Sequence, residues 1–137
     1  MAKDIFHETV KEALRTEGWI ITHDPLTLKL SKRNIFIDLG AEKIIAAEKD
    51  SQKIAVEIKS FIGLSPMTDF YKALGQYQLY YLALHKRLPD TVLYLAIPEE
   101  SYAMLIKDDI LAEFLEELAL KYIIFNPESK QIVQWIS

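Results

Sequence analysis

The chain lacks several features that would narrow its chemistry. Its 137 residues include no cysteine, which excludes disulfide bonds, thiolate zinc sites and cysteine nucleophiles and fits a reducing compartment. No apolar run approaches the roughly 20 residues that a membrane-spanning helix needs. The first residues also lack the apolar core of a signal peptide. We therefore expect a soluble, cytoplasmic protein that makes no membrane contact.

Long runs of positive charge are missing as well. The formal net charge is −4, and only short basic pairs occur, at positions 32–33 and 86–87. Because non-specific affinity for nucleic acids comes mainly from clustered Lys and Arg, this balance argues against a broad phosphate-binding surface. A P-loop, a glycine-rich dinucleotide motif, zinc-ligand spacing and a Ser/His/Asp signature are also absent.

What is present is enough for one folded domain. Half of the residues are apolar, and no repeat or linker divides the chain, so residues 1–137 should form a single domain. The order of the expected elements predicts an α/β fold, a mixed sheet flanked by helices. The expected helices span 5–16, 66–86 and 102–120, and the last has a break near Asp108. The expected strands span 19–22, 26–30, 35–48, 52–61, 91–97, 122–125 and 131–136, and the third is interrupted at Gly40.

The most informative motif is an acid and a lysine two positions apart in an otherwise apolar strand. Glu57 and Lys59 would point to one face of that strand, and Ile54, Val56 and Ile58 to the other. Burying a carboxylate and an ammonium group is costly unless both have partners. We therefore expect a further charged group on the same face of the strand, as a partner for Glu57 and Lys59.

Asp38, in the apolar stretch 34–39, is that candidate. A two-residue hairpin loop at 50–51 would pair Glu42 with Lys59 and place Asp38 and Glu42 on the face of Glu57. A bulge at Gly40 would change which acid lies closest. The same register pairs Ile45 with Val56 and turns Ile35, Ile37, Leu39 and Ile45 toward the core.

Two carboxylates and a lysine on one sheet face suit metal-dependent hydrolysis of a phosphodiester. Asp38 and Glu57 would bind Mg²⁺ or Mn²⁺, with the carbonyl of Ile58 as a further ligand. Lys59 would orient the attacking water or stabilise the transition state. An E-x-K triplet alone is more often part of a solvent-exposed sheet face. The apolar surroundings of this triplet, and the presence of Asp38 upstream on the same face, favour a metal site.

The long helix carries a second candidate pair. Gln76 and Tyr80 lie four residues apart, on one helix face, where an amide and a hydroxyl could hold a water or a phosphate oxygen. The alternative is an aromatic packing stripe, because tyrosines crowd this helix. In the first helix, His7 or Glu8 could add a metal or phosphate contact, although a surface or structural role is favoured.

These residues resemble the PD-(D/E)xK nuclease superfamily, also called restriction-endonuclease-like, and the pair Gln76 and Tyr80 is similar to that of its RecB-type members. Over nearly the whole chain, longer stretches resemble the XisH family. They are Val10-Lys11-x-Ala13-Leu14, Gly18-Trp19-x-Ile21-Thr22-x-Asp24-Pro25, Ile44-Ile45-Ala46-Ala47-Glu48, Val56-Glu57-Ile58-Lys59-Ser60-Phe61, Asp69-Phe70-x-x-Ala73-Leu74-Gly75-Gln76-Tyr77, and Phe125-Asn126-Pro127 with Ile132-Val133-x-Trp135.

The resemblance implies a cyanobacterial excision controlling factor, connected with excision of a DNA element in heterocyst differentiation and often accompanied by a small partner, XisI. It implies metal-ligand roles for Asp38 and Glu57, a catalytic role for Lys59 and supporting roles for Gln76 and Tyr80. The leading hypothesis is a nuclease-related accessory factor that acts on DNA. The alternatives are a non-catalytic regulator that binds a XisI-like partner and a nucleic-acid-binding module. A homodimer stays open.

Overall fold

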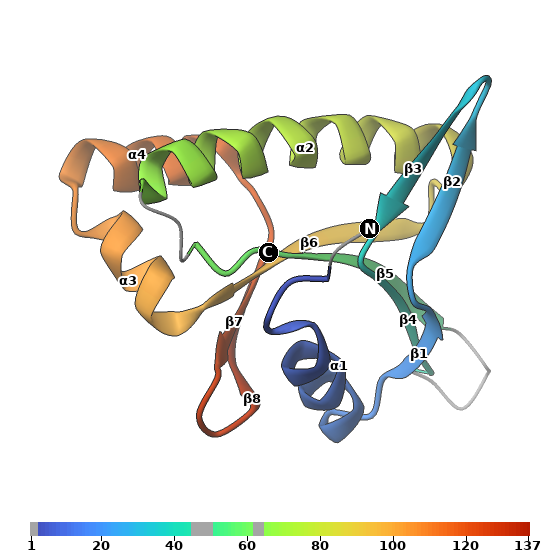
Figure 1. Cartoon of the computed structure of the whole chain (residues 1–137), viewed down its shortest axis with the longest axis horizontal. Helices are drawn as coiled ribbons and strands as arrows, with labels where there is room; N and C mark the ends of the chain where they lie inside the picture. The colour runs from blue at the N-terminus through green and yellow to red at the C-terminus, as the bar shows by residue number, and fades with distance from the viewer. Residues whose placement is uncertain (1–2, 45–50, 62–64) are drawn as a thin grey trace.

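The computed structural model describes residues 3–44, 51–61 and 65–137. Helices lie on both sides of a central sheet (Figure 1). In chain order the elements are α1 (His7–Thr16), β1 (Ile20–His23), β2 (Leu26–Leu30), β3 (Arg33–Ile37), β4 (Leu39–Ile44), β5 (Ser51–Ile58), α2 (Pro66–Arg87), β6 (Thr91–Pro98), α3 (Glu99–Ile106), α4 (Asp109–Leu118), β7 (Tyr122–Asn126) and β8 (Gln131–Ile136).

Six strands form one mixed sheet in the order β1-β4-β5-β6-β7-β8. The central strands β5, β6 and β7 are parallel, and the pairs β1–β4, β4–β5 and β7–β8 are antiparallel. The middle strands are apolar over most of their length because both of their faces are covered. This sheet and its four flanking helices confirm the predicted α/β architecture, which is consistent with a restriction-endonuclease-like fold.

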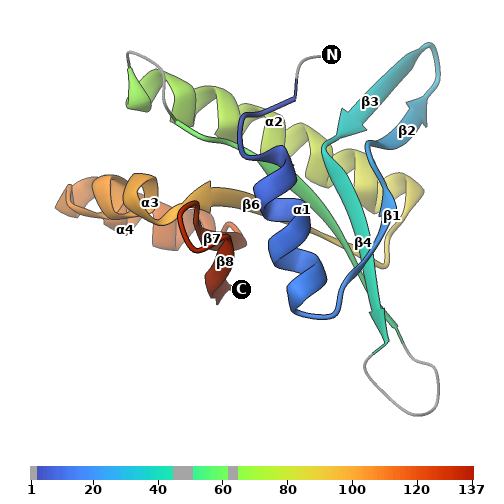
Figure 2. The ribbon, with the colours of Figure 1, turned by 60° about the horizontal axis from the view of Figure 1, so that its bottom comes forward.

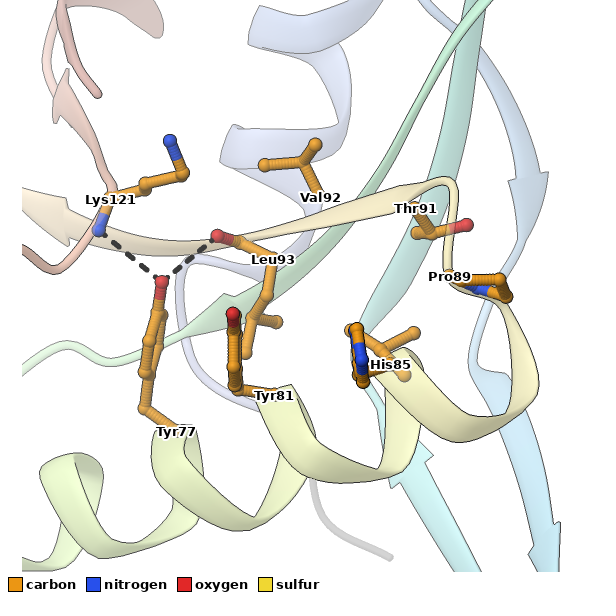
Figure 3. Close-up of a pocket in the computed structure, with 9 residues that line it drawn as sticks. Tyr77, Tyr81, His85, Pro89, Thr91, Val92, Leu93 and Lys121 are labelled. Atoms are coloured by element: carbon orange, nitrogen blue, oxygen red, sulfur yellow. Dashed lines mark hydrogen bonds between the residues drawn. The ribbon is translucent and has the colours of Figure 1, made fainter.

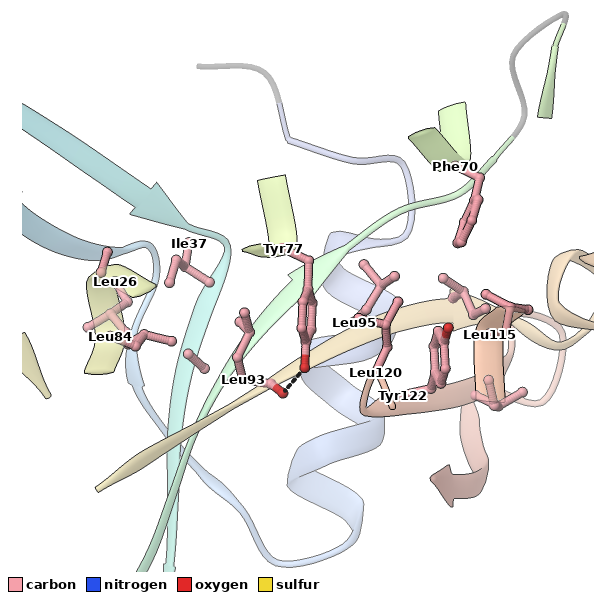
Figure 4. Close-up of a cluster of buried hydrophobic side chains, with 14 of the residues drawn as sticks. Leu26, Ile37, Phe70, Tyr77, Leu84, Leu93, Leu95, Leu115, Leu120 and Tyr122 are labelled. Atoms are coloured by element: carbon pink, nitrogen blue, oxygen red, sulfur yellow. Dashed lines mark hydrogen bonds between the residues drawn. The ribbon is translucent and has the colours of Figure 1, made fainter. Parts of the chain in front are cut away.

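Each face of the sheet has its own apolar core. On one face, Val10 of α1 packs in a cluster with Leu39 and Val56. On the other face, α2 contributes Tyr77 to a cluster that includes Leu93 of β6 (Figure 4). Figure 2 shows α1 and α2 on opposite sides of the strands. The period-two alternation along β5 therefore divides its side chains between two cores.

The long helix α2 is held at its start and in its middle. Ser65 caps the helix, and its hydroxyl accepts a hydrogen bond from the Thr68 N–H at 3.3 Å. The Tyr77 hydroxyl donates to the Leu93 carbonyl at 3.2 Å and accepts from the Lys121 N–H at 3.3 Å (Figure 3). One buried side chain thus ties the helix to β6 and to the residue before β7.

Strands β2 and β3 form a separate two-stranded sheet, in which Leu26 lies opposite Ile37. The predicted single strand over 35–48 is therefore wrong: the chain leaves the small sheet after Ile37 and enters the large one at Leu39. Ile35 and Ile37 do not share a core with Leu39, because they pack in the cluster under α2. The hairpin also contacts α2 through the Arg87 side chain, which donates to a backbone carbonyl of β2.

The predicted register of the β4–β5 hairpin is also wrong. Glu42 lies opposite Lys53 rather than Lys59, and Leu39 rather than Ile45 lies opposite Val56. Ser51, which was predicted to lie in the turn, instead belongs to β5 and lies opposite Ile44. Residues 45–50, which include the rest of the predicted turn, lie outside the described part of the chain. Because the difference of six positions (59 − 53) is even, the faces of the two strands still match.

The C-terminal half follows the predicted elements closely. The predicted break near Asp108 is confirmed: this residue caps α4, and its carboxylate accepts from the N–H groups of Ile110 and Leu111 at 3.0 Å each. Strands β7 and β8 pair around a turn at 127–130. Of the helices that the structure describes, none is long and apolar enough to cross a membrane.

Candidate functional site

Asp38 lies where the chain passes from the small sheet into the large one. The preceding residue pairs with β2 and the following residue pairs with β5, so its position is determined from both sides. Its backbone N–H donates to Glu57 Oε1 at 3.2 Å, and its own Oδ2 accepts from the Ile58 N–H at 2.8 Å. The first hydrogen bond holds the Glu57 carboxylate against the Asp38 backbone, and the second holds the Asp38 carboxylate against the end of β5.

Glu57 is a buried acid beside this carboxylate, with 7 % of its surface exposed. Lys59, which directly follows β5, reaches back so that its Nζ lies 3.6 Å from Glu57 Oε2. Burial and the charge of Asp38 raise the pKa of Glu57 to about 8, and Lys59 opposes this rise only in part. Two acids and one lysine therefore lie together in a site where burial and the neighbouring carboxylate disfavour the ionised form of Glu57.

The helix α2 covers this site with Tyr80. Burial raises the pKa of the Tyr80 hydroxyl to about 12, and the charges of Glu57 and Asp38 add to this rise. Gln76 lies one turn earlier on the same helix face. Its Oε1 is buried and has no hydrogen-bond partner among the described residues. A buried amide oxygen without a partner is costly, so it marks a place for a missing donor or cation.

The donor set fits a hard divalent cation. Carboxylate oxygens are the ligands that Mg²⁺ and Mn²⁺ prefer, and both Asp38 and Glu57 keep free lone pairs beyond their backbone hydrogen bonds. A cation there would stabilise the ionised form of Glu57, which burial and the charge of Asp38 disfavour. The Ile58 carbonyl lies between Glu57 and Lys59 in the chain, and its role as a ligand stays a prediction.

Asp4 and Ser101 hold the residue after Lys59, which the sequence did not reveal. The Ser60 N–H donates to Asp4 Oδ2 at 3.0 Å, and the Ser101 hydroxyl donates to the Ser60 carbonyl at 3.2 Å. The other oxygen of Asp4 accepts from the N–H of Phe6, immediately before α1. Contacts over more than 40 positions leave no local pattern, so only the tertiary structure shows that these residues fix the Lys59 backbone.

Glu42 does not join the site. It lies two positions beyond Gly40 along β4 and opposite Lys53 of β5, nearer the other end of that strand. Asp38 is therefore the acid that pairs with Glu57, and Glu42 is not a replacement for it.

His7 and Glu8 do not join the site either. His7 is buried on the α1 side of the molecule, where its Nε2 lies 2.7 Å from Asp24 Oδ1; Glu8 is exposed. His7, Glu8 and Asp24 are near enough to hold a metal together. However, Lys11 already lies 2.7 Å from the second oxygen of Asp24. Asp24 therefore already has two partners, His7 and Lys11, which supports the structural role favoured for His7. The second ring nitrogen of His7, Nδ1, is buried and has no hydrogen-bond partner among the described residues.

The chain is similar to known proteins along nearly its whole length. A crystal structure of an XisH family protein from Nostoc punctiforme is 41% identical, covers 98% of this chain and 100% of its own, and superposes with a TM-score of 0.86. An fdxN element excision controlling factor protein from Anabaena variabilis is 40% identical over the same shares, with a TM-score of 0.85. No curated protein matches the chain. Residues 1–133 match the family model described as XisH protein, and the chain belongs to the XisH family.

Proposed function

We propose that this protein is a metal-dependent phosphodiesterase that acts on DNA in the controlled excision of a DNA element. One observation carries the proposal: the carboxylates of Asp38 and Glu57 are held together by backbone hydrogen bonds, with the amine of Lys59 beside them. The relative from Anabaena variabilis, named an fdxN element excision controlling factor, supports the biological setting.

The side chains divide the chemistry between them. Asp38 and Glu57 would hold the cation, and Glu57 would lose its proton as the cation binds. A bound Mg²⁺ or Mn²⁺ would polarise the phosphate and lower the pKa of an attacking water. Lys59, kept near Glu57 and with a side chain 29 % exposed, can reach both the site and solvent and would stabilise the negative charge that develops on the phosphate.

The proposed phosphate position lies under α2. Tyr80 is close enough to feel the charges of both acids, so its hydroxyl can donate to a phosphate oxygen or a bound water. Gln76, one turn away, would find through its amide group the partner that its buried oxygen lacks. This supports a polar role for both residues beside their packing role.

Cleavage of DNA is the direct test. Supercoiled plasmid and single-stranded DNA are incubated with the purified protein and Mg²⁺ or Mn²⁺, and nicking is followed on gels. Lys59→Met should abolish cleavage while circular dichroism shows a folded protein. Lys53→Met is the matched control: this lysine lies on the same strand but opposite Glu42, and its loss should leave cleavage intact. Wild-type protein inert on both DNA forms with both metals would overturn the proposal.

Metal binding can be tested apart from cleavage. A cation that binds only the folded state raises the melting temperature as its concentration rises. Asp38→Asn combined with Glu57→Gln should remove that rise for Mn²⁺ and Mg²⁺. An undiminished shift in the double variant would place the cation elsewhere in the protein.

A second candidate is a non-catalytic regulator that binds a XisI-like partner. The observation in its favour is the apolar outer surface of α3 and α4, on which Met104, Ile110 and Phe114 are each more than half exposed. Such a surface suits a protein partner better than DNA. Partner binding that is lost in Phe114→Arg but unchanged in Lys59→Met, together with an inert wild type, would support this candidate over the enzyme.

A further inference from the structure

The outer face of α2 is apolar and has a glycine at its centre. Tyr71, Leu79 and Leu82 are 63%, 63% and 54% exposed. Gly75 lies among them, and a Cβ built on it would meet no other atom within 4 Å. In Figure 1, α2 runs along the outside of the molecule, and no described element covers the outer side of its first half.

Nothing within the described part of the chain explains this glycine. Gly75 is in the interior of a 22-residue helix, where glycine costs about 0.5–1 kcal/mol relative to alanine. No neighbouring side chain or backbone needs the space that the missing Cβ leaves. A bare patch on a helix surface does allow the backbone of a second helix to approach closely, since interaxial distance depends on the side chains at the contact.

Helix geometry determines which positions would meet across a two-fold axis at Gly75. At about 100° per residue, Tyr71 and Leu79 lie about 40° to either side of Gly75, and Thr68 and Leu82 about 20° to either side. When two such helices pack antiparallel about a two-fold axis at Gly75, position 75 − n faces position 75 + n. Tyr71 then lies opposite Leu79 of the other copy, and Thr68 opposite Leu82.

The charges suit the same arrangement. Lys72 is the charged residue within about 60° of Gly75 over the described positions 67–82, and in the symmetric pair it faces Gln78. No like charges therefore meet across this contact, so charge repulsion between the two copies does not oppose it there. The surface is self-complementary, as a two-fold interface requires.

We propose that α2 is a dimerisation surface, on which a second copy of this chain packs its own α2 antiparallel about a two-fold axis at Gly75. The contact from 68 to 82 is about 22 Å long at 1.5 Å per residue, which places it at the small end of specific interfaces. We expect a weak dimer, with a dissociation constant in the micromolar range. The interface is separate from the site of Asp38, Glu57 and Lys59. Whether the protein cleaves DNA therefore does not affect this proposal.

The first experiment places an arginine at the proposed axis. Wild-type protein and Gly75→Arg are compared by sedimentation equilibrium from about 5 to 200 µM, the range over which a micromolar dimer dissociates. The wild type should shift from monomer to dimer, and Gly75→Arg should stay monomeric. Its melting temperature should be unchanged or higher at low concentration, because arginine favours helix over glycine. Loss of the dimer is then not a folding defect.

Phe114→Arg on α4 is the matched control, because Phe114 is also an exposed apolar residue, at 52%. It should dimerise as the wild type does. A wild type that is monomeric over the whole range overturns the proposal. So does a dimer that Phe114→Arg dissociates and Gly75→Arg leaves intact, which would place the interface on α4.

A cross-linking experiment tests the position of the axis. Because the chain has no cysteine, one introduced cysteine can form a disulfide only with its copy. At a two-fold axis the two Cα atoms of Gly75→Cys would lie near the 4.4–6.8 Å that a disulfide spans. Mild oxidation should give a covalent dimer rapidly for Gly75→Cys and at least tenfold more slowly for Phe114→Cys. Equal rates in the two variants would contradict the axis.

Discussion

Replacing Glu57 by glutamine should change how the stability of the protein depends on pH. Glutamine keeps the shape of the side chain and its acceptor for the Asp38 N–H, but it does not titrate. In the wild type, burial and the charge of Asp38 raise the pKa of Glu57 from 4.5 to about 8. The folded state therefore binds this proton more tightly than the unfolded state does.

The sign follows from linkage. A group whose pKa is raised on folding contributes its stability in full below the unfolded pKa and loses it as pH rises through the folded pKa. The Glu57 contribution should thus be complete near pH 4.5 and gone above about pH 8. That difference corresponds to about 5 kcal/mol at about 1.4 kcal/mol per pH unit. Water entering the site reduces it, so we expect about 2–3 kcal/mol.

The assay is urea denaturation followed by tryptophan fluorescence, in the presence of a chelator, from about pH 5 to about pH 9. Glu57→Gln should match the wild type near pH 5 and exceed its free energy of unfolding by about 2–3 kcal/mol above pH 8. Taking the difference between the two proteins removes the titration of the groups that do not interact with residue 57. Glu42→Gln, on the neighbouring strand, is the control and should show no such trend.

A difference between wild type and Glu57→Gln that does not change with pH would refute this reasoning. So would a wild type that becomes more stable than the variant as pH rises, because that result would mean that Glu57 is ionised at little cost. In either case the site would not disfavour the ionised form of Glu57, and the argument for a bound cation would lose its electrostatic support.

Three further substitutions test contacts in the fold. Tyr77→Phe should cost about 1–3 kcal/mol in urea denaturation, because the Leu93 carbonyl loses its buried donor. Asp108→Ala removes the cap of α4 and should cost about 1 kcal/mol in thermal denaturation; an unchanged melting temperature would contradict the cap. Asp24→Ala leaves Lys11, with a side chain only 17% exposed, without its partner and should cost about 2–4 kcal/mol; restoration of stability by Lys11→Met in the double variant would show that the unpaired charge causes the loss.

Local patterns predicted most of the elements. Ser65 marks the start of α2, Asp108 the break between α3 and α4, and alternation along β5 puts Glu57 and Lys59 on the face opposite Val56. These signals act within a few residues, so one sequence contains them in full. Alternation back from Leu39 of β4 was enough to place Asp38 on the face of Glu57, since parity survives any even change of register. It failed one residue earlier, at Ile37, which packs in the other core.

The features that the sequence predicted wrongly, or did not predict, depend on contacts between distant residues. The sequence does not show that the chain changes sheets at Asp38, because the apolar stretch continues through Ile37 and Leu39 without a turn signal. The hairpin register depended on where the chain reverses between β4 and β5, which alternation does not determine. The contacts of Asp4 with Ser60 and of His7 with Asp24 form only once helix and sheet have packed.

The small sheet of β2 and β3 is a suitable place to insert a label into this protein. Its strands meet in a tight reversal at positions 31–32, where Ser31 has a φ of 51°, and Figure 1 shows this tip pointing away from the six-stranded sheet. A fluorophore or affinity tag inserted there would extend into solvent, because exposed loop tips tolerate insertion. Insertion next to Asp38, at the other end of the same strand, would instead move one of the two acids.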